Sequence, residues 1–258
     1  MGTKRASLGY DVTGPDDGPA LVLGSSLGTT RAMWDAMTPT LGKTFRVVRY
    51  DHLGHGESAV PDGPYTIDRL ADELAAVLDE LGIQRAHHAG VSLGGMVALQ
   101  FAASFPERVD RLAVICSSAH LPPAENWTQR AHAARTEGVE SIADVVVGRW
   151  FTDAAPAGTV AAARSMLAGT PAEGYAGCCE AIREMDLRPI LGKITAPTLA
   201  IAGADDPATP VEHAHVIVDG IRAGGTSAAV EIVDGAAHLA AVERPDAVAR
   251  LLLTHFRT

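Results

Sequence analysis

The pentapeptide Gly90-Val91-Ser92-Leu93-Gly94 constrains the fold of this chain more than any other stretch. A serine on a tight strand-to-helix turn has a strained backbone, so the residues two before and two after it must be nearly free of side chain. The flanking residues fit, since residues 86–91 read as a strand and apolar residues then follow at helical spacing up to Phe105. Ser92 is therefore predicted at the end of a strand, facing the free N–H groups of a helix. For the pentapeptide alone, an ordinary glycine-rich turn capped by a serine is the alternative.

Length and charge limit the function classes. The chain has 258 residues and a formal net charge of -10 at pH 7, which suits one large α/β domain with a modest insertion. Nucleic acid is not an expected partner, because phosphate binding needs clustered Lys and Arg. No apolar run approaches the roughly 20 residues of a membrane span, and no signal-type apolar core follows residues 1–5. We expect a cytoplasmic protein with no membrane partner.

Strand and helix patterns alternate along most of the chain. Strands are expected at residues 6–12, 19–24, 45–50, 86–91, 112–116, 198–203 and 229–233. The first two, split by a turn-rich segment, suggest a hairpin-like opening. Helices are expected near residues 33–41, 66–81, 93–105, 211–221 and 245–256, with Thr66 capping the second and Gly82 ending it. This alternation predicts an α/β fold with a mostly parallel, doubly wound sheet, whose reactive loops gather at its carboxyl edge.

The pattern changes between residues 121 and 191. We find no strand signal there, and helical stretches at about 125–137, 139–151, 157–168 and 172–183 are separated by Gly and Pro. The sequence therefore predicts a helical cap over residues 121–191, inserted into a core made of residues 1–120 and 192–258.

A serine nucleophile needs a base, and the base needs an orienting acid. Asp205 and Asp206 follow the strand at 198–203, and His238 follows the strand at 229–233. The order serine, acid, histidine is that of the α/β-hydrolases, so Ser92, Asp206 and His238 are predicted as the catalytic triad. Asp206 is preferred because the third residue after the glycine usually carries the acid, which leaves Asp205 as a loop or helix-capping residue.

An oxyanion hole needs two backbone N–H donors. Leu93 supplies one because it directly follows Ser92. Leu27 is predicted to supply the other, because Leu27-Gly28 falls where this fold usually has His-Gly-x-Gly, with Ser25-Ser26 in place of His-Gly. A plain glycine turn is the alternative, but the position at a strand end favours the functional interpretation.

No metal site is predicted, although ten histidines include the close pairs His52 with His55, His87 with His88, and His213 with His215. These pairs lack the additional Cys or carboxylate ligands of structural zinc sites, so solvated or hydrogen-bonded roles are expected. Reduced thiols are expected at Cys116, Cys178 and Cys179.

With these residues the chain resembles the 3-oxoadipate enol-lactonases of the α/β-hydrolase superfamily over essentially its whole length. Further stretches carry the resemblance, namely Ser25 to Thr29 with Met33-Trp34, Glu125-Asn126-Trp127, Arg149 to Thr152, Gly174 to Arg183, and Gly203 to Pro210. One departure is Leu53, where relatives usually have an arginine.

The resemblance implies that a serine acyl-enzyme opens 3-oxoadipate enol-lactone to 3-oxoadipate in aromatic catabolism, with no metal or organic cofactor. A small anionic lactone is then the partner, and the oligomeric state is left open. The substrate carboxylate requires a local cation or several donors. Trp127 and Arg130 of the first cap helix and Ser26 are predicted to bind substrate; a tryptophan in the cap core and an exposed arginine are the alternative.

Other functions on the same scaffold are kept open. Another small-molecule lactone or carboxylic-ester hydrolase would keep the triad and differ in the cap. A cofactor-free perhydrolase or haloperoxidase-like enzyme would use the triad on peroxide, and a ligand receptor would use no triad. The three triad residues argue against a receptor, and the cap motifs favour a lactonase.

Overall fold

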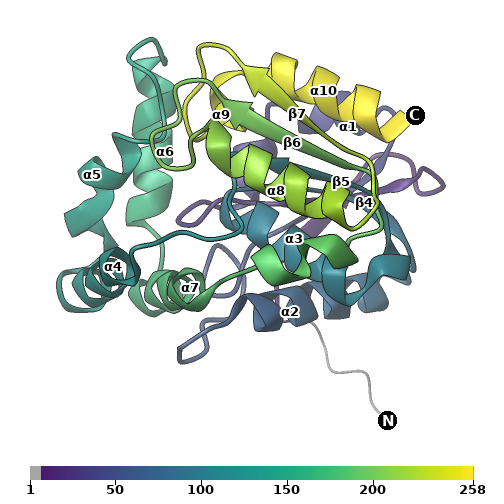
Figure 1. Cartoon of the computed structure of the whole chain (residues 1–258). Helices are drawn as coiled ribbons and strands as arrows, with labels where there is room; N and C mark the ends of the chain where they lie inside the picture. Colours follow the sequence, from purple (N-terminus) through teal and green to yellow (C-terminus); the bar gives the residue numbers. More distant parts are fainter. Residues whose placement is uncertain (1–6, 258) are drawn as a thin grey trace.

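The computed structural model describes residues 7–257 (Figure 1). In this part of the chain seven strands form one sheet in the order β1-β3-β2-β4-β5-β6-β7. They are β1 Tyr10–Thr13, β2 Ala20–Gly24, β3 Arg46–Tyr50, β4 Ala86–Val91, β5 Val109–Ile115, β6 Thr198–Gly203 and β7 Ala228–Val233. Only β1 pairs with its neighbour in antiparallel fashion. The predicted mostly parallel α/β sheet is confirmed.

The predicted hairpin at the start of the chain is wrong. β1 pairs with β3, while β2 lies between β3 and β4 and forms parallel ladders with both. β2 therefore has no free edge for β1. Asp11 lies opposite Arg49 in the β1–β3 register, and their side chains form an ion pair of 2.7 Å that favours this neighbour. Ala6, where the first strand was predicted to begin, lies outside the described residues.

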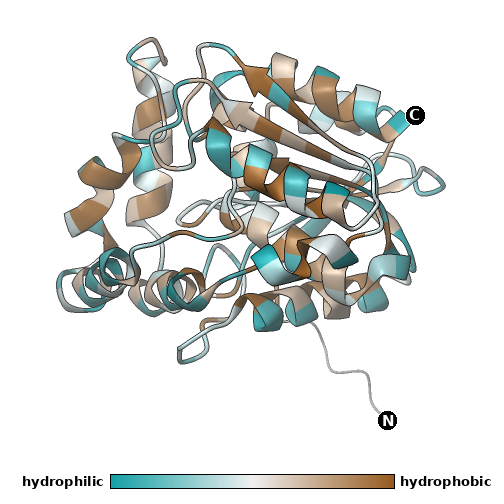
Figure 2. Ribbon diagram, in the orientation of Figure 1, coloured by the Kyte–Doolittle hydropathy of each residue, from teal (hydrophilic) through white to brown (hydrophobic). Residues whose placement is uncertain are grey.

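Helices cover both faces of the sheet. The helices of the core are α1 Thr38–Leu41, α2 Ile67–Glu80, α3 Leu93–Ser104, α8 Val211–Ala223, α9 Ala240–Glu243 and α10 Pro245–Arg257, with 3-10 turns at Arg31–Trp34, Pro106–Arg108 and Arg188–Lys193. Figure 1 shows α2, α3 and α8 along one face and α1 with α10 along the other, so the sheet is wound on both sides. Figure 2 shows the apolar residues gathered along the inner strands and the helix sides that face them.

Two local details bear on the predicted helices. The helix predicted over residues 33–41 is instead the turn Arg31–Trp34 followed by the short α1. Pro39 explains the break, because proline fits the first turn of a helix and not its interior. In α2, Thr66 accepts a hydrogen bond from the Arg69 N–H at 3.1 Å, and Gly82 follows the helix with a φ of +67°. The predicted cap and end of that helix are confirmed.

The segment between β5 and β6 is helical. It contains α4 Ala124–Glu137, a 3-10 turn at Val139–Ile142, α5 Ala143–Val147, α6 Ala157–Ala168 and α7 Ala172–Glu184. The helix predicted over residues 139–151 is shorter than expected, and the chain leaves it at Gly148. Figure 1 shows these helices set to one side of the sheet. The division at residues 121 and 191 stays a prediction.

The last of these helices, α7, lies directly against the core. A Cβ atom on Gly174 would lie 2.2 Å from the backbone oxygen of Gly54, and one on Gly177 would lie 2.8 Å from the ring of Tyr65. Since residues three apart share one face of a helix, α7 turns a glycine face to the core and approaches it at backbone distance.

No helix within residues 7–257 is long and apolar enough to cross a membrane. Cys116, Cys178 and Cys179 are free and buried, which confirms the expected reduced thiols.

Candidate active site

Ser92 lies on the turn between β4 and α3 with a φ of 53°, a conformation that few residues other than glycine adopt. The two flanking positions must be glycine, because a side chain at either one would collide with neighbouring backbone atoms. A Cβ atom on Gly90 would lie 2.2 Å from the carbonyl carbon of Gly94, and one on Gly94 would lie 2.3 Å from the Gly24 oxygen. The strand-turn-helix predicted from the pentapeptide is confirmed, and it presents the Ser92 hydroxyl at the carboxyl edge of the sheet.

A chain of hydrogen bonds joins Ser92 to His238 and Asp206. The Ser92 Oγ lies 2.9 Å from His238 Nε2, and His238 Nδ1 lies 2.9 Å from Asp206 Oδ2. A carboxylate only accepts, so Nδ1 carries the proton and Nε2 accepts from the Ser92 hydroxyl. Asp205 is exposed and makes no such contact. The structure therefore brings together the three residues predicted as the triad, with Asp206 and not Asp205 beside the histidine.

Asp206 is held as a carboxylate. Burial alone would raise its pKa, but the hydrogen bonds from His238 and Thr209 outweigh burial and lower the pKa to about 2. Thr209 contributes both its hydroxyl, at 2.7 Å, and its backbone N–H, at 3.0 Å. Thr209 is a site residue that the sequence analysis missed; its place three residues after the acid was the available signal, because a short loop can fold back onto a carboxylate.

The loop with Leu27 is fixed beside the helix that begins at Leu93. The Gly94 N–H donates to the Ser25 carbonyl at 3.0 Å, which joins the loop to α3. Within residues 7–257, no hydrogen-bond acceptor meets the N–H groups of Leu27 and Leu93. The two predicted oxyanion donors are therefore available to a ligand, and Leu27 lines the same cavity as Ser92.

Two buried histidines hold this loop from the other side. His52 Nε2 bonds the Ser25 carbonyl at 2.8 Å, and the Gly28 N–H donates to His55 Nε2 at 2.9 Å. Burial and the neighbouring His55 lower the pKa of His52 to about 3, so His52 is neutral at physiological pH. The sequence indicated hydrogen-bonded histidines, but it did not indicate that they support the loop of Leu27.

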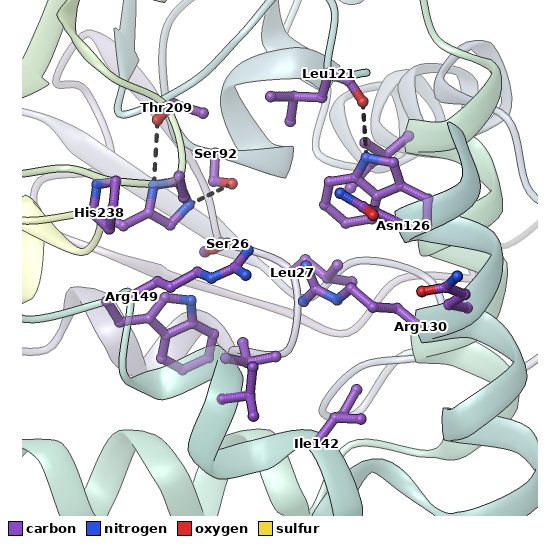
Figure 3. Close-up of a pocket in the computed structure, with 18 of the residues that line it drawn as sticks. Ser26, Leu27, Ser92, Leu121, Asn126, Arg130, Ile142, Arg149, Thr209 and His238 are labelled. Atoms are coloured by element: carbon purple, nitrogen blue, oxygen red, sulfur yellow. Dashed lines mark hydrogen bonds between the residues drawn. The ribbon is translucent and has the colours of Figure 1, made fainter. Parts of the chain in front are cut away.

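A cavity of about 460 Å³ opens above Ser92 and His238 (Figure 3). This volume is in the range of small-molecule sites. The cap supplies most of its wall, and the three predicted substrate-binding residues, Ser26, Trp127 and Arg130, all line it. Among the described residues that line the cavity there are two arginines, Arg130 and Arg149, and no Asp or Glu. The cavity is thus cationic in a chain with a net charge of -10.

Arg130 is partly buried, and the part of the chain that the structure describes supplies it with no counter-charge. Its guanidinium lies 4.7 Å from the centroid of the Trp127 ring and donates a hydrogen bond to the Tyr175 hydroxyl. Burial raises the pKa values of Tyr175 and Cys179 to about 12, so both neighbours are neutral. No carboxylate in the described part of the chain comes within 4.0 Å of Arg130, and its Nε atom has no hydrogen-bond partner. Such a cation favours an anionic ligand.

A buried carboxylate ties the cap to the loop that holds His238. Glu243 accepts hydrogen bonds from the N–H of Ala237 at 2.9 Å and from the N–H of Thr152 at 3.0 Å, and from the Thr152 hydroxyl. The Leu239 N–H donates to the Trp150 carbonyl at 2.9 Å in the same region. Glu243 was not predicted as a site residue, because its partner Thr152 lies 91 residues away along the chain.

The chain matches the model of the alpha/beta hydrolase fold family over residues 19–245. It is 37% identical to 3-oxoadipate enol-lactonase 2 of Acinetobacter baylyi, with 95% of this chain and 91% of the relative covered. It is 34% identical to 3-oxoadipate enol-lactonase 1 of the same organism, with 93% and 89% covered. A crystal structure of the enol-lactonase from Burkholderia xenovorans LB400 is similar at a TM-score of 0.91 and 36% identity, with 97% and 96% of the two chains covered. The chain therefore belongs to the alpha/beta hydrolase fold family and, within it, to the family of the 3-oxoadipate enol-lactonases.

Proposed function

We propose that this protein opens 3-oxoadipate enol-lactone to 3-oxoadipate through an acyl-enzyme on Ser92. The observation that carries the proposal is the hydrogen-bonded series Ser92, His238 and Asp206 at the base of a cavity whose described lining residues include two arginines and no Asp or Glu. The similarity to enol-lactonases supports the choice of substrate. With this substrate the enzyme would act in aromatic catabolism in the cytoplasm.

In the first half-reaction the Ser92 oxygen attacks the lactone carbonyl while His238 Nε2 takes the hydroxyl proton. Asp206 keeps the imidazole in the required tautomer and stabilises the imidazolium. The N–H groups of Leu27 and Leu93 stabilise the oxyanion. The ring C–O bond then breaks, and the enolate, which stays attached to the acyl group, takes the proton from His238 and becomes a ketone.

In the second half-reaction a water molecule attacks the Ser92 ester while His238 accepts its proton. The ester C–O bond breaks, His238 returns this proton to the Ser92 oxygen, and the new acid group loses its remaining proton to solvent, so the single product leaves as a dicarboxylate. These steps use only side chains, backbone N–H groups and water. The chain therefore has no need of a metal or an organic cofactor in this mechanism.

Substrate selection is assigned to the cap. Arg130 would bind the free carboxylate of the lactone by charge-assisted hydrogen bonds. Trp127 is already fixed by its bond from Nε1 to the Leu121 carbonyl at 2.9 Å, so its ring offers a rigid apolar wall to the lactone. Ser26 lies beside Leu27 in the same wall and supplies a further polar contact.

The test is an assay of the purified protein on the enol-lactone, followed by loss of its ultraviolet absorbance, beside a neutral aryl ester and a lactone without a carboxylate. We expect the highest kcat/KM for the enol-lactone, and no turnover by Ser92→Ala. Turnover of the neutral compounds alone would make the protein a different ester or lactone hydrolase. Turnover that requires peroxide would make it a perhydrolase.

A further inference from the structure

Arg149 is a second cation of the cavity that the proposed mechanism does not use. It directly precedes Trp150, whose carbonyl accepts the hydrogen bond from Leu239, so its backbone lies beside the loop of His238. Arg130 instead projects from α4 and is anchored on Tyr175 of α7. Figure 3 shows the two side chains extending toward one another from different sides of the cavity. The cavity therefore has one cation on the histidine side and one on the α4 side.

Neither guanidinium has a carboxylate within 4.0 Å among residues 7–257. This separates them from arginines that have a carboxylate within 3.1 Å, such as Arg31, Arg49, Arg135 and Arg164. Among the described residues the two arginines lack a carboxylate partner although the chain, with a net charge of -10, has more acidic than basic side chains. Two like charges that face one cavity repel each other, and bound anions would relieve that repulsion.

The proposed reaction supplies two anions at different stages, and the inference rests on that function. The lactone carries one carboxylate into the cavity. Hydrolysis of the acyl-enzyme breaks the ester C–O bond at Ser92, adds the elements of water with one proton returning to the Ser92 oxygen through His238, and releases a second carboxylate there as the other proton passes to solvent. The second carboxylate forms beside Ser92 and His238. The backbone of Arg149 lies on that same side of the cavity.

We infer that Arg149 is an anion-binding residue that acts together with Arg130, so that the cavity binds a linear dicarboxylate with one carboxylate at each arginine. The ligand class is the dianionic product and stable dicarboxylates of similar length. Arg149 then determines product affinity, whereas Arg130 contacts the carboxylate that is present in the substrate from the beginning.

The experiment is titration calorimetry of the intact protein with adipate, a stable six-carbon dicarboxylate, and with hexanoate as the monocarboxylate of the same length. We expect the wild type to bind adipate at least about tenfold more tightly than hexanoate, because only adipate can form charge-assisted hydrogen bonds with both arginines. Arg149→Met should remove that preference, and Arg149→Lys should restore part of it.

Arg250→Met is the matched control, because Arg250 is exposed on α10, outside the residues that line the cavity, and its loss changes the net charge equally. It should bind adipate like the wild type. Thermal unfolding of each variant checks that the fold is intact; Arg149 is itself exposed, so its loss should leave the melting temperature unchanged. Equal adipate affinities in wild type and Arg149→Met, or no adipate preference in the wild type, would overturn the inference.

Calorimetry separates this inference from the proposed function. Preferential adipate binding that needs Arg149, in a protein that leaves the enol-lactone untouched, would keep the dicarboxylate site and reject the lactonase. Rapid lactone hydrolysis with unchanged adipate binding in Arg149→Met would keep the lactonase and reject the dicarboxylate site.

Discussion

At the scale of single residues, the two neighbouring aspartates have opposite surroundings. Asp206 is buried against His238 and Thr209, while Asp205 is exposed. Asp206→Asn should lower kcat on the order of 10⁴-fold, because an amide leaves the imidazole in the wrong tautomer. Asp205→Asn is the matched control and should change kcat less than about twofold. Steady-state kinetics on the enol-lactone measure both, and the opposite ranking would move the acid to Asp205.

Arg130 allows a second test at this scale. Arg130→Met keeps much of the aliphatic stem over Trp127 and removes the cation. It should lower kcat/KM for the enol-lactone by about tenfold or more, since a charged hydrogen bond contributes roughly 1.5–3 kcal/mol. A neutral ester that uses the same serine should lose much less. Equal losses on the two substrates would mean that Arg130 has a structural role.

At the scale of elements, Glu243 connects α9 with the cap and with the loop of His238. Glu243→Gln replaces an oxygen acceptor by an amide donor next to N–H groups, so a buried donor is left without a partner at a cost of roughly 1–3 kcal/mol. We expect a lower free energy of unfolding in urea and a lower kcat. Glu231→Gln on the exposed side of β7 makes the same chemical change and should have neither effect. A stable, fully active Glu243→Gln would rule out the connecting role.

The bounds of single elements could be predicted from the sequence, whereas their pairing in space could not. The strand at 198–203 and the helix at 157–168 have clear local patterns, and the observed bounds of both agree with the prediction. The partner of β1 was missed because pairing is decided by which sheet edges are free, and that depends on strands far away in the chain. The pairing of residues across the cap, as between Glu243 and Thr152, has no local signature either. Ser92, Asp206 and His238 could be chosen from sequence because each lies on the loop or turn that follows a recognisable strand.

At the scale of the whole molecule, buried histidines make stability depend on pH. Burial lowers the pKa of His52 and His88 to about 3, and it lowers those of His55, His87, His213 and His255 as well. The unfolded chain takes up these protons below about pH 6.5 while the folded chain does not. The free energy of unfolding should therefore be insensitive to these groups above pH 7 and fall progressively between pH 6.5 and 3.

His88 is the most direct test of this dependence. Its ring stacks on Phe101 at 4.7 Å, and neither ring nitrogen has a hydrogen-bond partner in the described part of the chain. His88→Leu should reduce the loss of stability on acidification by up to about 1.4 kcal/mol for each pH unit. Urea unfolding at pH 8 and pH 5 measures the difference between the two proteins. Parallel curves for wild type and variant would show that His88 does not contribute.

The glycine face of α7 has a consequence for how ligands enter. Since Gly174 and Gly54 meet at backbone distance, the cap cannot swing away from the core as a rigid body without breaking that contact. Motion that admits a ligand is then confined to α5 and its neighbours, where Val145 borders the cavity and is 69% exposed. Hydrogen exchange should be slow along α7 and faster along α5. Entry would then depend on local opening of one short helix, and equal exchange rates in the two helices would contradict this.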